Sequence, residues 1–280
     1  MTAATLIWGS IPIFAILCSL PSPIFVFFRV LFGLPFVVVL SLKYIGKQNL
    51  LNPKPFLWIF LSGVALSLNW IFFFFAIQIT DVATAVILYY FGPVFTIILA
   101  VVFLKEPLTK RVAISTIVAF FGAILTIAPS FEKSSNITLY GILISLLASL
   151  FYGLLGFFSK LATKHHKPIK ITTYQLAISI VFTLPFVFFL KFTLDTTTIL
   201  LLIVTGIIHT ALALFLWYDS LNFITVSEAS VLSYLDPFFA IALSFIIFGQ
   251  KPLLLQIIGG IFIAIGGIMV SMQNTKRKLS

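Results

Sequence analysis

Long apolar segments follow one another along nearly the whole chain, with short polar gaps between them. A segment of roughly 17–25 apolar residues can cross the hydrocarbon core of a bilayer as a helix. The segments do not alternate strictly between apolar and polar residues, which argues against membrane β-strands. We therefore expect an all-α integral membrane protein with ten transmembrane helices, at residues 3–20, 23–42, 56–77, 82–104, 112–129, 138–159, 171–191, 198–219, 226–248 and 253–272.

The composition agrees with a lipid environment. Of the 280 residues, 61% are hydrophobic and 9% are charged, against about 45–50% and about 25% in a soluble domain. The net charge of +10 does not indicate nucleic-acid binding, because the basic residues lie in short gaps and form no face of their own. The single cysteine, Cys18, excludes an internal disulfide and a multi-cysteine metal site. We expect no cofactor and no metal.

The distribution of Lys and Arg predicts the orientation. Thirteen of these residues lie after even-numbered segments or in the C-terminal tail, and three lie after odd-numbered segments. Cytoplasmic loops are enriched in Lys and Arg, so both termini are expected in the cytoplasm. The remaining basic residue, Arg29, lies inside the second segment.

An internal repeat is indicated by pairs of residues that are 144 positions apart. Pro93 and Pro237 lie near the middle of the fourth and ninth segments, and the same offset relates three further pairs, Gly9 and Gly153, Gly122 and Gly266, and Ala85 and Ala229. The agreement predicts two halves of five helices each, residues 1–130 and 137–273. Because five is odd, the second half enters the membrane from the opposite side. Such an inverted repeat is the usual plan of secondary transporters.

The two prolines interrupt helical hydrogen bonding. Each lacks an N–H, so the carbonyl four residues earlier, on Tyr89 or Ser233, loses its helical partner. In lipid an unpaired carbonyl costs roughly several kcal/mol and must face protein, water or a ligand. Two such kinks at equivalent positions predict a site near the midplane where the halves meet. The alternative is that each kink serves packing alone.

Charged residues within the segments are expensive, at about 2.5–3.5 kcal/mol each near mid-helix. Asp236, directly before Pro237, either binds a cationic group, or takes up a proton, or holds the kink by accepting hydrogen bonds. Glu228 either lines the site, where it could also take up a proton, or pairs with loop lysines. Arg29 either binds a substrate carboxylate or neutralises Asp236 in a structural pair, and we favour the pair. His209 is expected to be a polar packing residue.

Tyrosine and tryptophan side chains lie in or beside the segments of the expected site. Each offers a flat apolar face and one polar atom, which suits a mixed metabolite or an ammonium group. The alternatives are an interfacial belt, helix packing or interhelical hydrogen bonding. The candidate substrate-binding residues are Trp8, Ser10, Asn69, Trp70, Gln78, Tyr89, Tyr90, Tyr152, Trp217, Tyr218, Tyr234 and Asp236. Outside these segments, Asp81 resembles a helix N-cap.

The chain resembles the EamA group of the drug/metabolite transporter superfamily. The resemblance rests on "IWGS" near the start, on "NWIFFFFAI" from Asn69, on residues 85–93 followed by "VVFLKEPLTKR", and on "EASVLSYLDPFFAIALSFIIFGQKP" from Glu228. It implies ten helices in two EamA repeats, a central cavity lined largely by helices three, four, eight and nine, and alternating access in a prokaryotic cytoplasmic membrane. Gln250-Lys251 departs from the glutamate that the first repeat carries as Glu106.

The family resemblance favours export of amino acids or related small metabolites. The alternative is import or exchange of a larger metabolite such as S-adenosylmethionine, a role that some similar proteins of intracellular bacteria fill. More distant alternatives are a channel or a membrane-embedded enzyme. The chain carries no G-x-S-x-G or H-E-x-x-H motif, which argues against an enzyme. A monomer is sufficient for this plan, and a dimer is compatible with it.

Overall fold

The computed structural model describes residues 1–80, 82–131, 138–249 and 251–279. Within these ranges every regular element is a helix, which confirms the all-α class. The elements are α1 (Thr2–Gly9), α2 (Ile11–Cys18), α3 (Ser22–Leu51), α4 (Phe56–Ile79), α5 (Val82–Tyr89), α6 (Phe91–Phe103), α7 (Lys110–Phe131), α8 (Leu139–Thr163), α9 (Pro168–Phe189), α10 (Thr196–Val204), the π-helix η1 (Thr205–Leu212), α11 (Ala213–Ser220), α12 (Val226–Ser233), α13 (Leu235–Phe248) and α14 (Leu254–Leu279).

Nine helical stretches of the described chain are long and apolar enough to cross a bilayer. The first expected span, residues 3–20, is the one that is missing from these nine. It is not one continuous helix, because Ser10 separates α1 from α2. Pro12 cannot donate to the carbonyl of Trp8, and the Ser10 hydroxyl donates to the carbonyl of Ile7 at 2.7 Å. The first span is therefore a broken helix, which corrects the expectation.

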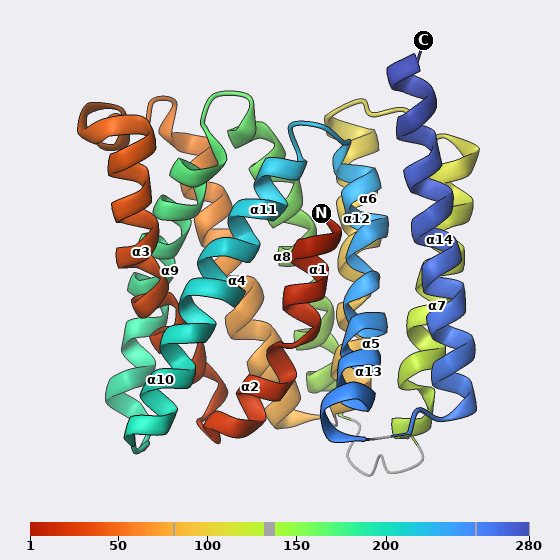
Figure 1. Ribbon diagram of the computed structural model, residues 1–280, viewed down its shortest axis with the longest axis horizontal. Coiled ribbons are helices and arrows are strands. Elements are labelled where there is room, and N and C mark those ends of the chain that lie inside the picture. Colours follow the sequence, from red (N-terminus) through yellow and green to blue (C-terminus); the bar gives the residue numbers. More distant parts are fainter. Residues whose placement is uncertain (81, 132–137, 250, 280) are drawn as a thin grey trace.

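The helices stand side by side across one layer (Figure 1). The first helices of the two halves, α1 and α8, run in opposite directions through the layer (Figure 1). The antiparallel helices α7 and α14 pack together at one end of the layer, and α3 packs with α9 towards the other end. The remaining helices lie between these pairs.

The same helix contact occurs twice, once in each half. A Cβ at Gly9 of α1 would lie 2.7 Å from the Cβ of Phe239 on α13. A Cβ at Gly153 of α8 would lie 2.7 Å from the Cβ of Phe95 on α6. Both glycines and both phenylalanines are 144 positions apart, as expected for inverted repeats. Small residues of this kind let membrane helices approach closely.

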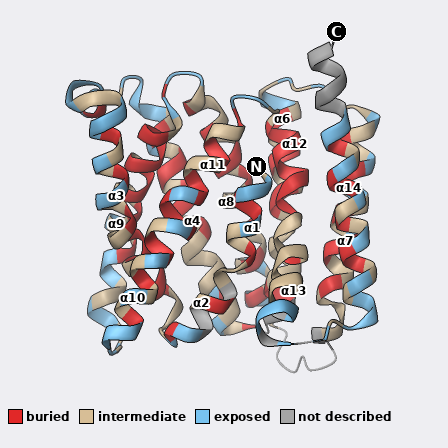
Figure 2. Cartoon of the chain, in the orientation of Figure 1, coloured by how far each residue is buried: buried red, intermediate tan, exposed pale blue. Residues whose placement is uncertain are grey.

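Burial follows the division between an interior and a lipid-facing surface. All eight residues of α12 are buried, and the buried residues concentrate on the inner faces of the helices (Figure 2). Large apolar side chains cover the outside, and Phe188 and Ile246 are 77% and 74% exposed. Such a surface is stable in lipid and would aggregate in water.

Side chains cap several helices at the aqueous faces. Asp195 precedes α10, and its Oδ1 accepts from the backbone N–H of Thr198 at 2.8 Å. Hydrogen bonds from the side chain and the backbone of Thr198 lower the pKa of Asp195. Thr138 caps α8 in the same way through the N–H of Gly141. The predicted cap at Asp81 lies outside the described residues.

Two neighbouring glycines of α14 provide a test of the α7–α14 contact. A Cβ at Gly266 would lie 2.8 Å from the carbonyl oxygen of Ser115, whereas the nearest atom to a Cβ at Gly267 is 3.6 Å away. We expect Gly266→Ala to lower the free energy of unfolding by about 1–3 kcal/mol through overpacking. Gly267→Ala should be neutral or stabilise by up to about 1 kcal/mol, because alanine favours a helix. Thermal unfolding in detergent measures both, and equal melting temperatures would contradict the contact.

Candidate functional site

The two halves meet where two membrane crossings are interrupted. Tyr90 separates α5 from α6, and Tyr234 separates α12 from α13, each three residues before a proline, Pro93 or Pro237. The Tyr234 hydroxyl donates to the carbonyl oxygen of Tyr90 at 2.8 Å. The two tyrosines are themselves 144 positions apart, so this hydrogen bond joins equivalent positions of the two halves. The interruptions thus lie against each other.

A tyrosine cluster surrounds this junction, and we define it as Tyr89, Tyr90, Tyr152, Tyr234 and Asp236. The Asp236 carboxyl interacts electrostatically with the hydroxyls of Tyr89, Tyr90 and Tyr152. Its Oδ1 is buried and accepts no hydrogen bond from the residues that the structure describes. A buried polar atom without a partner costs roughly 1–3 kcal/mol. Such a carboxyl oxygen is suited to a ligand or a proton.

Asn69 of α4 holds the cluster in place. Its Oδ1 accepts from the Tyr89 hydroxyl at 3.0 Å, and its Nδ2 donates to the carbonyl of Ala148 on α8 at 2.9 Å. The ring of Tyr89 lies edge-on to that of Tyr152, with centroids 5.5 Å apart. Asn69 therefore links α4, α5 and α8, and its amide is already used within the protein.

A second group, the arginine cluster, comprises Arg29, Trp70, Thr210, His209, Ser10 and Trp8. Arg29 is 3% exposed, and its Nε donates to Thr210 Oγ1 at 2.8 Å. Its guanidinium carbon lies 4.7 Å from the centroid of the Trp70 ring, a cation–π distance. The Nε bond uses one of the five N–H donors of the guanidinium.

The π-helix η1 supplies two members of the arginine cluster. Thr210 donates to the carbonyl of Thr205, five residues earlier, at 3.1 Å. The neighbouring residue His209 has Nε2 2.8 Å from the Ser10 hydroxyl, and its carbonyl accepts from Trp8 Nε1 at 3.0 Å. Single π-helical turns occur frequently at functional sites. The break between α1 and α2 therefore packs against the π-helix.

The two clusters adjoin through Tyr89, which interacts electrostatically with both Arg29 and Asp236. Arg29 and Asp236 themselves form no ion pair in the part of the chain that the structure describes, since Arg29 contacts Thr210 and aromatic rings instead. The favoured structural pair was therefore wrong. One positive and one negative group lie near the junction without neutralising each other directly.

Glu228 has a structural role that the sequence did not indicate. Its Oε2 accepts from the N–H of Thr225 at 2.8 Å, while the Thr225 hydroxyl accepts from the N–H of Glu228 at 3.1 Å. This reciprocal pair is a capping box at the start of α12. Glu228 also interacts electrostatically with Lys160, so a pairing with lysines stays a prediction beside the helix cap.

Three predicted residues lie apart from the clusters. Trp217 and Tyr218 are buried in the hydrophobic core that α11 shares with α8 and α9. The Tyr218 hydroxyl lies near Ser159 and Gln175 and has no hydrogen-bond partner among the described residues. Gln78 is exposed in the last turn of α4. The structure thus brings together the other nine substrate-binding candidates and separates these three from them.

Glu106 and Lys160 have contacts that the sequence did not reveal. The Glu106 carboxylate accepts from the N–H groups of Val226 and Ser227, at 3.1 and 3.2 Å, and from the Ser227 hydroxyl at 2.8 Å. Lys160 donates to the carbonyls of Leu221 and Ile224 in the α11–α12 connection. Glu106 thereby ties α6 of the first half to α12 of the second. Gln250, its equivalent, lies outside the described residues.

Inverted halves, paired helix interruptions and unpaired charges near their junction define a membrane transporter, and comparison with known proteins agrees. The sequence model of the EamA-like transporter family matches residues 1–128 and again 139–272. The chain belongs to the EamA-like transporter family. It is a multi-pass membrane protein of ten crossings in two inverted EamA repeats. The exact repeat limits, residues 1–130 and 137–273, stay predictions.

Several relatives share this organisation. The chain is 30% identical to the uncharacterized transporter YxxF of Bacillus subtilis, over 95% of this chain and 86% of that one. It is 28% identical to the S-adenosylmethionine uptake transporter of Rickettsia bellii, over 81% of this chain and 75% of that one. A crystal structure of a protein 16% identical in sequence matches the fold with a TM-score of 0.86, over 98% and 96% of the two chains.

The Glu106 contact can be tested by two substitutions. Glu106→Ala removes three hydrogen bonds from the start of α12 and a negative charge that the helix dipole favours. We expect it to lower the free energy of unfolding by about 0.5–2 kcal/mol and to speed amide exchange at Val226 and Ser227. Glu106→Gln keeps an acceptor and should lose less. Identical exchange rates in the wild type and Glu106→Ala would contradict the cap.

Proposed function

We propose that the protein is a secondary transporter of small metabolites that carry both an ammonium and a carboxylate group, working by alternating access. The observation that supports the proposal is the placement of Arg29 and Asp236. Both lie within membrane crossings, both adjoin Tyr89, and neither neutralises the other by direct contact. A zwitterionic substrate has charges of the opposite sign for each group.

The arginine cluster suits the carboxylate. A guanidinium binds a carboxylate through two parallel N–H donors, and Thr210 and Trp70 hold Arg29 from its other sides. Ser10 and His209 add a hydroxyl and an imidazole beside it. His209 Nδ1 is buried and has no hydrogen-bond partner within the described ranges of the chain. This nitrogen offers a further contact for a polar substrate atom.

The tyrosine cluster suits the ammonium group. Asp236 provides a negative charge and interacts electrostatically with Tyr89, Tyr90 and Tyr152. Aromatic faces attract a cation by about 0.5–2 kcal/mol, more when water is excluded. An amino acid or a related small metabolite satisfies both clusters at once. Export of such compounds is the direction that the family resemblance favours.

S-Adenosylmethionine is a second candidate substrate, with uptake or exchange as the direction. The observation that favours it is the similarity to S-adenosylmethionine uptake transporters of Rickettsia, 28% and 27% identical to this chain. The molecule carries the same ammonium and carboxylate groups, together with a sulfonium and an adenine. The tyrosine rings could attract the sulfonium and stack on the adenine.

Alternating access is proposed to follow from the paired interruptions. The two repeats would rock about Tyr90 and Tyr234, where α5–α6 and α12–α13 lack continuous helical hydrogen bonds. The Tyr234–Tyr90 hydrogen bond would break and form again as the halves move. Proton uptake by Asp236 would couple transport to the proton gradient, while exchange needs no such coupling.

The positive-inside pattern supports an orientation in a prokaryotic cytoplasmic membrane. Helices α3, α6, α8 and α14 all end at the same face of the layer (Figure 1). That face therefore receives most of the lysines and arginines, and both termini are proposed to be cytoplasmic. The two inverted halves of one chain supply all the residues of the proposed site. A monomer is therefore sufficient for transport, and a dimer is compatible with it.

Substitution of the carboxylate tests the proposal directly. Asp236→Asn removes the charge that would bind the ammonium group, and charged hydrogen bonds contribute about 1.5–3 kcal/mol. We expect amino-acid flux in proteoliposomes to fall by about tenfold to a hundredfold. Asp195→Asn is the matched control, because asparagine caps a helix as well as aspartate. If Asp236→Asn retained full, pH-dependent transport, neither substrate binding nor proton coupling could be assigned to Asp236.

A thermal-shift screen of the purified protein tests the substrate class. Methionine and S-adenosylmethionine should raise the melting temperature, because a ligand at about 100 times its Kd stabilises by about 2.7 kcal/mol. Putrescine and adenosine should not, because they lack a carboxylate. Arg29→Gln and Arg29→Lys should weaken the shift, and Lys110→Gln should preserve it. A shift from putrescine equal to that from methionine would disprove the zwitterion assignment. A larger shift from S-adenosylmethionine would favour the second candidate.

A further inference from the structure

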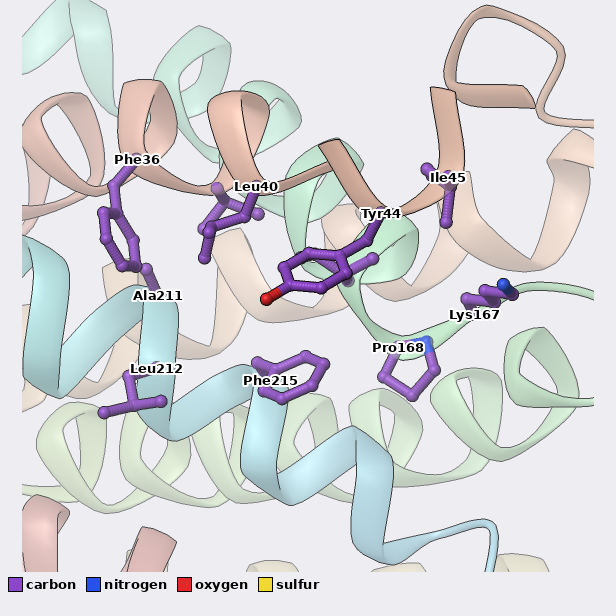
Figure 3. Close-up of a pocket in the computed structure, with 11 residues that line it drawn as sticks. Phe36, Leu40, Tyr44, Ile45, Lys167, Pro168, Ala211, Leu212 and Phe215 are labelled. Carbon is purple, nitrogen blue, oxygen red and sulfur yellow. The ribbon is translucent and has the colours of Figure 1, made fainter. Parts of the chain in front are cut away.

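An apolar groove of about 460 Å³ lies between α3, the start of α9 and the η1–α11 segment. Phe36, Leu40 and Tyr44 of α3 form one wall, and Leu212 and Phe215 form the opposite wall (Figure 3). The groove opens on the outside of the helix layer, where Phe36 and Leu212 are 36% and 39% exposed. Its lining is therefore suited to a hydrocarbon chain.

A basic hollow of about 210 Å³ continues the groove near Gly46, where the backbone of α3 departs from helical geometry. Ile45 and Lys167 line both spaces, and Asn49, His165, His166 and Lys170 complete the hollow. Among the described residues that line either space there is no aspartate or glutamate. Lys43 and Lys47 of α3 are exposed nearby in sequence. The charges are complementary to an anion.

The protein already engages two of the basic side chains of the hollow. Lys170 Nζ donates to the carbonyl of Asn52 at 2.7 Å, and His166 Nε2 lies 2.9 Å from the carbonyl of Pro55. Burial lowers the pKa of His166, so this histidine is neutral at pH 7. Lys167 is exposed, and its carbonyl oxygen accepts from the N–H groups of Lys170 and Ile171. Its side chain forms no hydrogen bond or ion pair with the rest of the described chain. Its ammonium group is free to bind a ligand.

The length of the groove matches one leaflet of a bilayer. From Phe36 to Ile45, α3 rises about 14 Å at about 1.5 Å per residue, and half of a hydrocarbon core is about 15 Å. The basic hollow lies at the end of the groove nearest the end of α3, the face that the positive-inside pattern places in the cytoplasm. The Tyr44 hydroxyl points into the groove (Figure 3). A chain and its headgroup thus find apolar and basic surroundings in the right order.

We propose that this groove and hollow form a binding site for an anionic glycerophospholipid, with one acyl chain between α3 and α11 and the phosphate at Lys167. Basic pockets between helices on the cytoplasmic side are suited to anionic headgroups. Ala211 and Leu212 directly follow Thr210, the hydrogen-bond partner of Arg29. The bound lipid therefore bridges the two helices that hold the arginine cluster together.

Native mass spectrometry of the full chain in detergent tests this site. Phosphatidylglycerol and phosphatidylcholine with the same acyl chains are titrated separately. The wild type should bind at least one phosphatidylglycerol about fivefold more tightly than phosphatidylcholine, since a basic residue near an anionic headgroup contributes about that factor. Lys167→Gln should remove this preference. Lys110→Gln, an exposed lysine at the start of α7, should keep it.

A second pair of variants tests the acyl chain. Leu212→Trp fills the groove and should reduce binding of both lipids. Leu200→Trp, on the exposed face of α10 and outside the groove, should not. Inorganic phosphate at the same concentration as phosphatidylglycerol should not displace the lipid, because phosphate has no acyl chain to occupy the groove. Equal affinity for the two lipids in the wild type overturns the proposal, and so does equal loss in Lys167→Gln and Lys110→Gln. If Lys167→Gln fails to fold, Leu212→Trp against Leu200→Trp decides.

Discussion

The need to pair every backbone polar group inside lipid governs this structure. A membrane helix can be interrupted only where another group replaces the missing partner. Side chains donate to backbone carbonyls at three of these places. The Tyr234 hydroxyl donates to the carbonyl of Tyr90, Trp8 donates to the carbonyl of His209 in the π-helix, and the Ser10 hydroxyl donates to the carbonyl of Ile7. These hydrogen bonds bring polar and aromatic side chains to the junction of the two halves, and those side chains form the candidate site.

The scaffold is symmetric while its chemistry is not. Glycine and phenylalanine contacts recur at an offset of 144 residues and fix the helices of both halves in the same way. The charges occur once. Gly92 occupies the position equivalent to Asp236, where a Cβ would lie 2.7 Å from Tyr152, and Thr173 occupies the position equivalent to Arg29. A site between equivalent halves thus acquires one positive and one negative side, and it can orient a substrate that carries both charges.

The proposed lipid groove and the proposed transport site share structural elements. Helix α3 carries Arg29 towards the interior and Phe36, Leu40 and Tyr44 towards the groove, and the η1–α11 segment carries Thr210 and Leu212 in the same two directions. Occupation of the groove therefore bears on how closely these two helices pack. Because Glu106 joins the two halves at the start of α12, the junction is also held at a helix end. The packing of α3 against the η1–α11 segment and the Glu106 contact therefore both bear on the candidate site.

The sequence alone determined the all-α class, the ten crossings, the inverted halves and the family, because apolar length, basic residues and a fixed offset are properties of the chain itself. It also indicated Asp236, Arg29 and most of the aromatic residues. Only the tertiary structure decided which of these residues meet. Glu228 caps its own helix, and Arg29 contacts Thr210 and Trp70 rather than Asp236. The break at Ser10 packs against the π-helix. Side-chain partners are chosen by distances of a few ångströms between helices far apart in sequence, and those distances arise only when the helices pack.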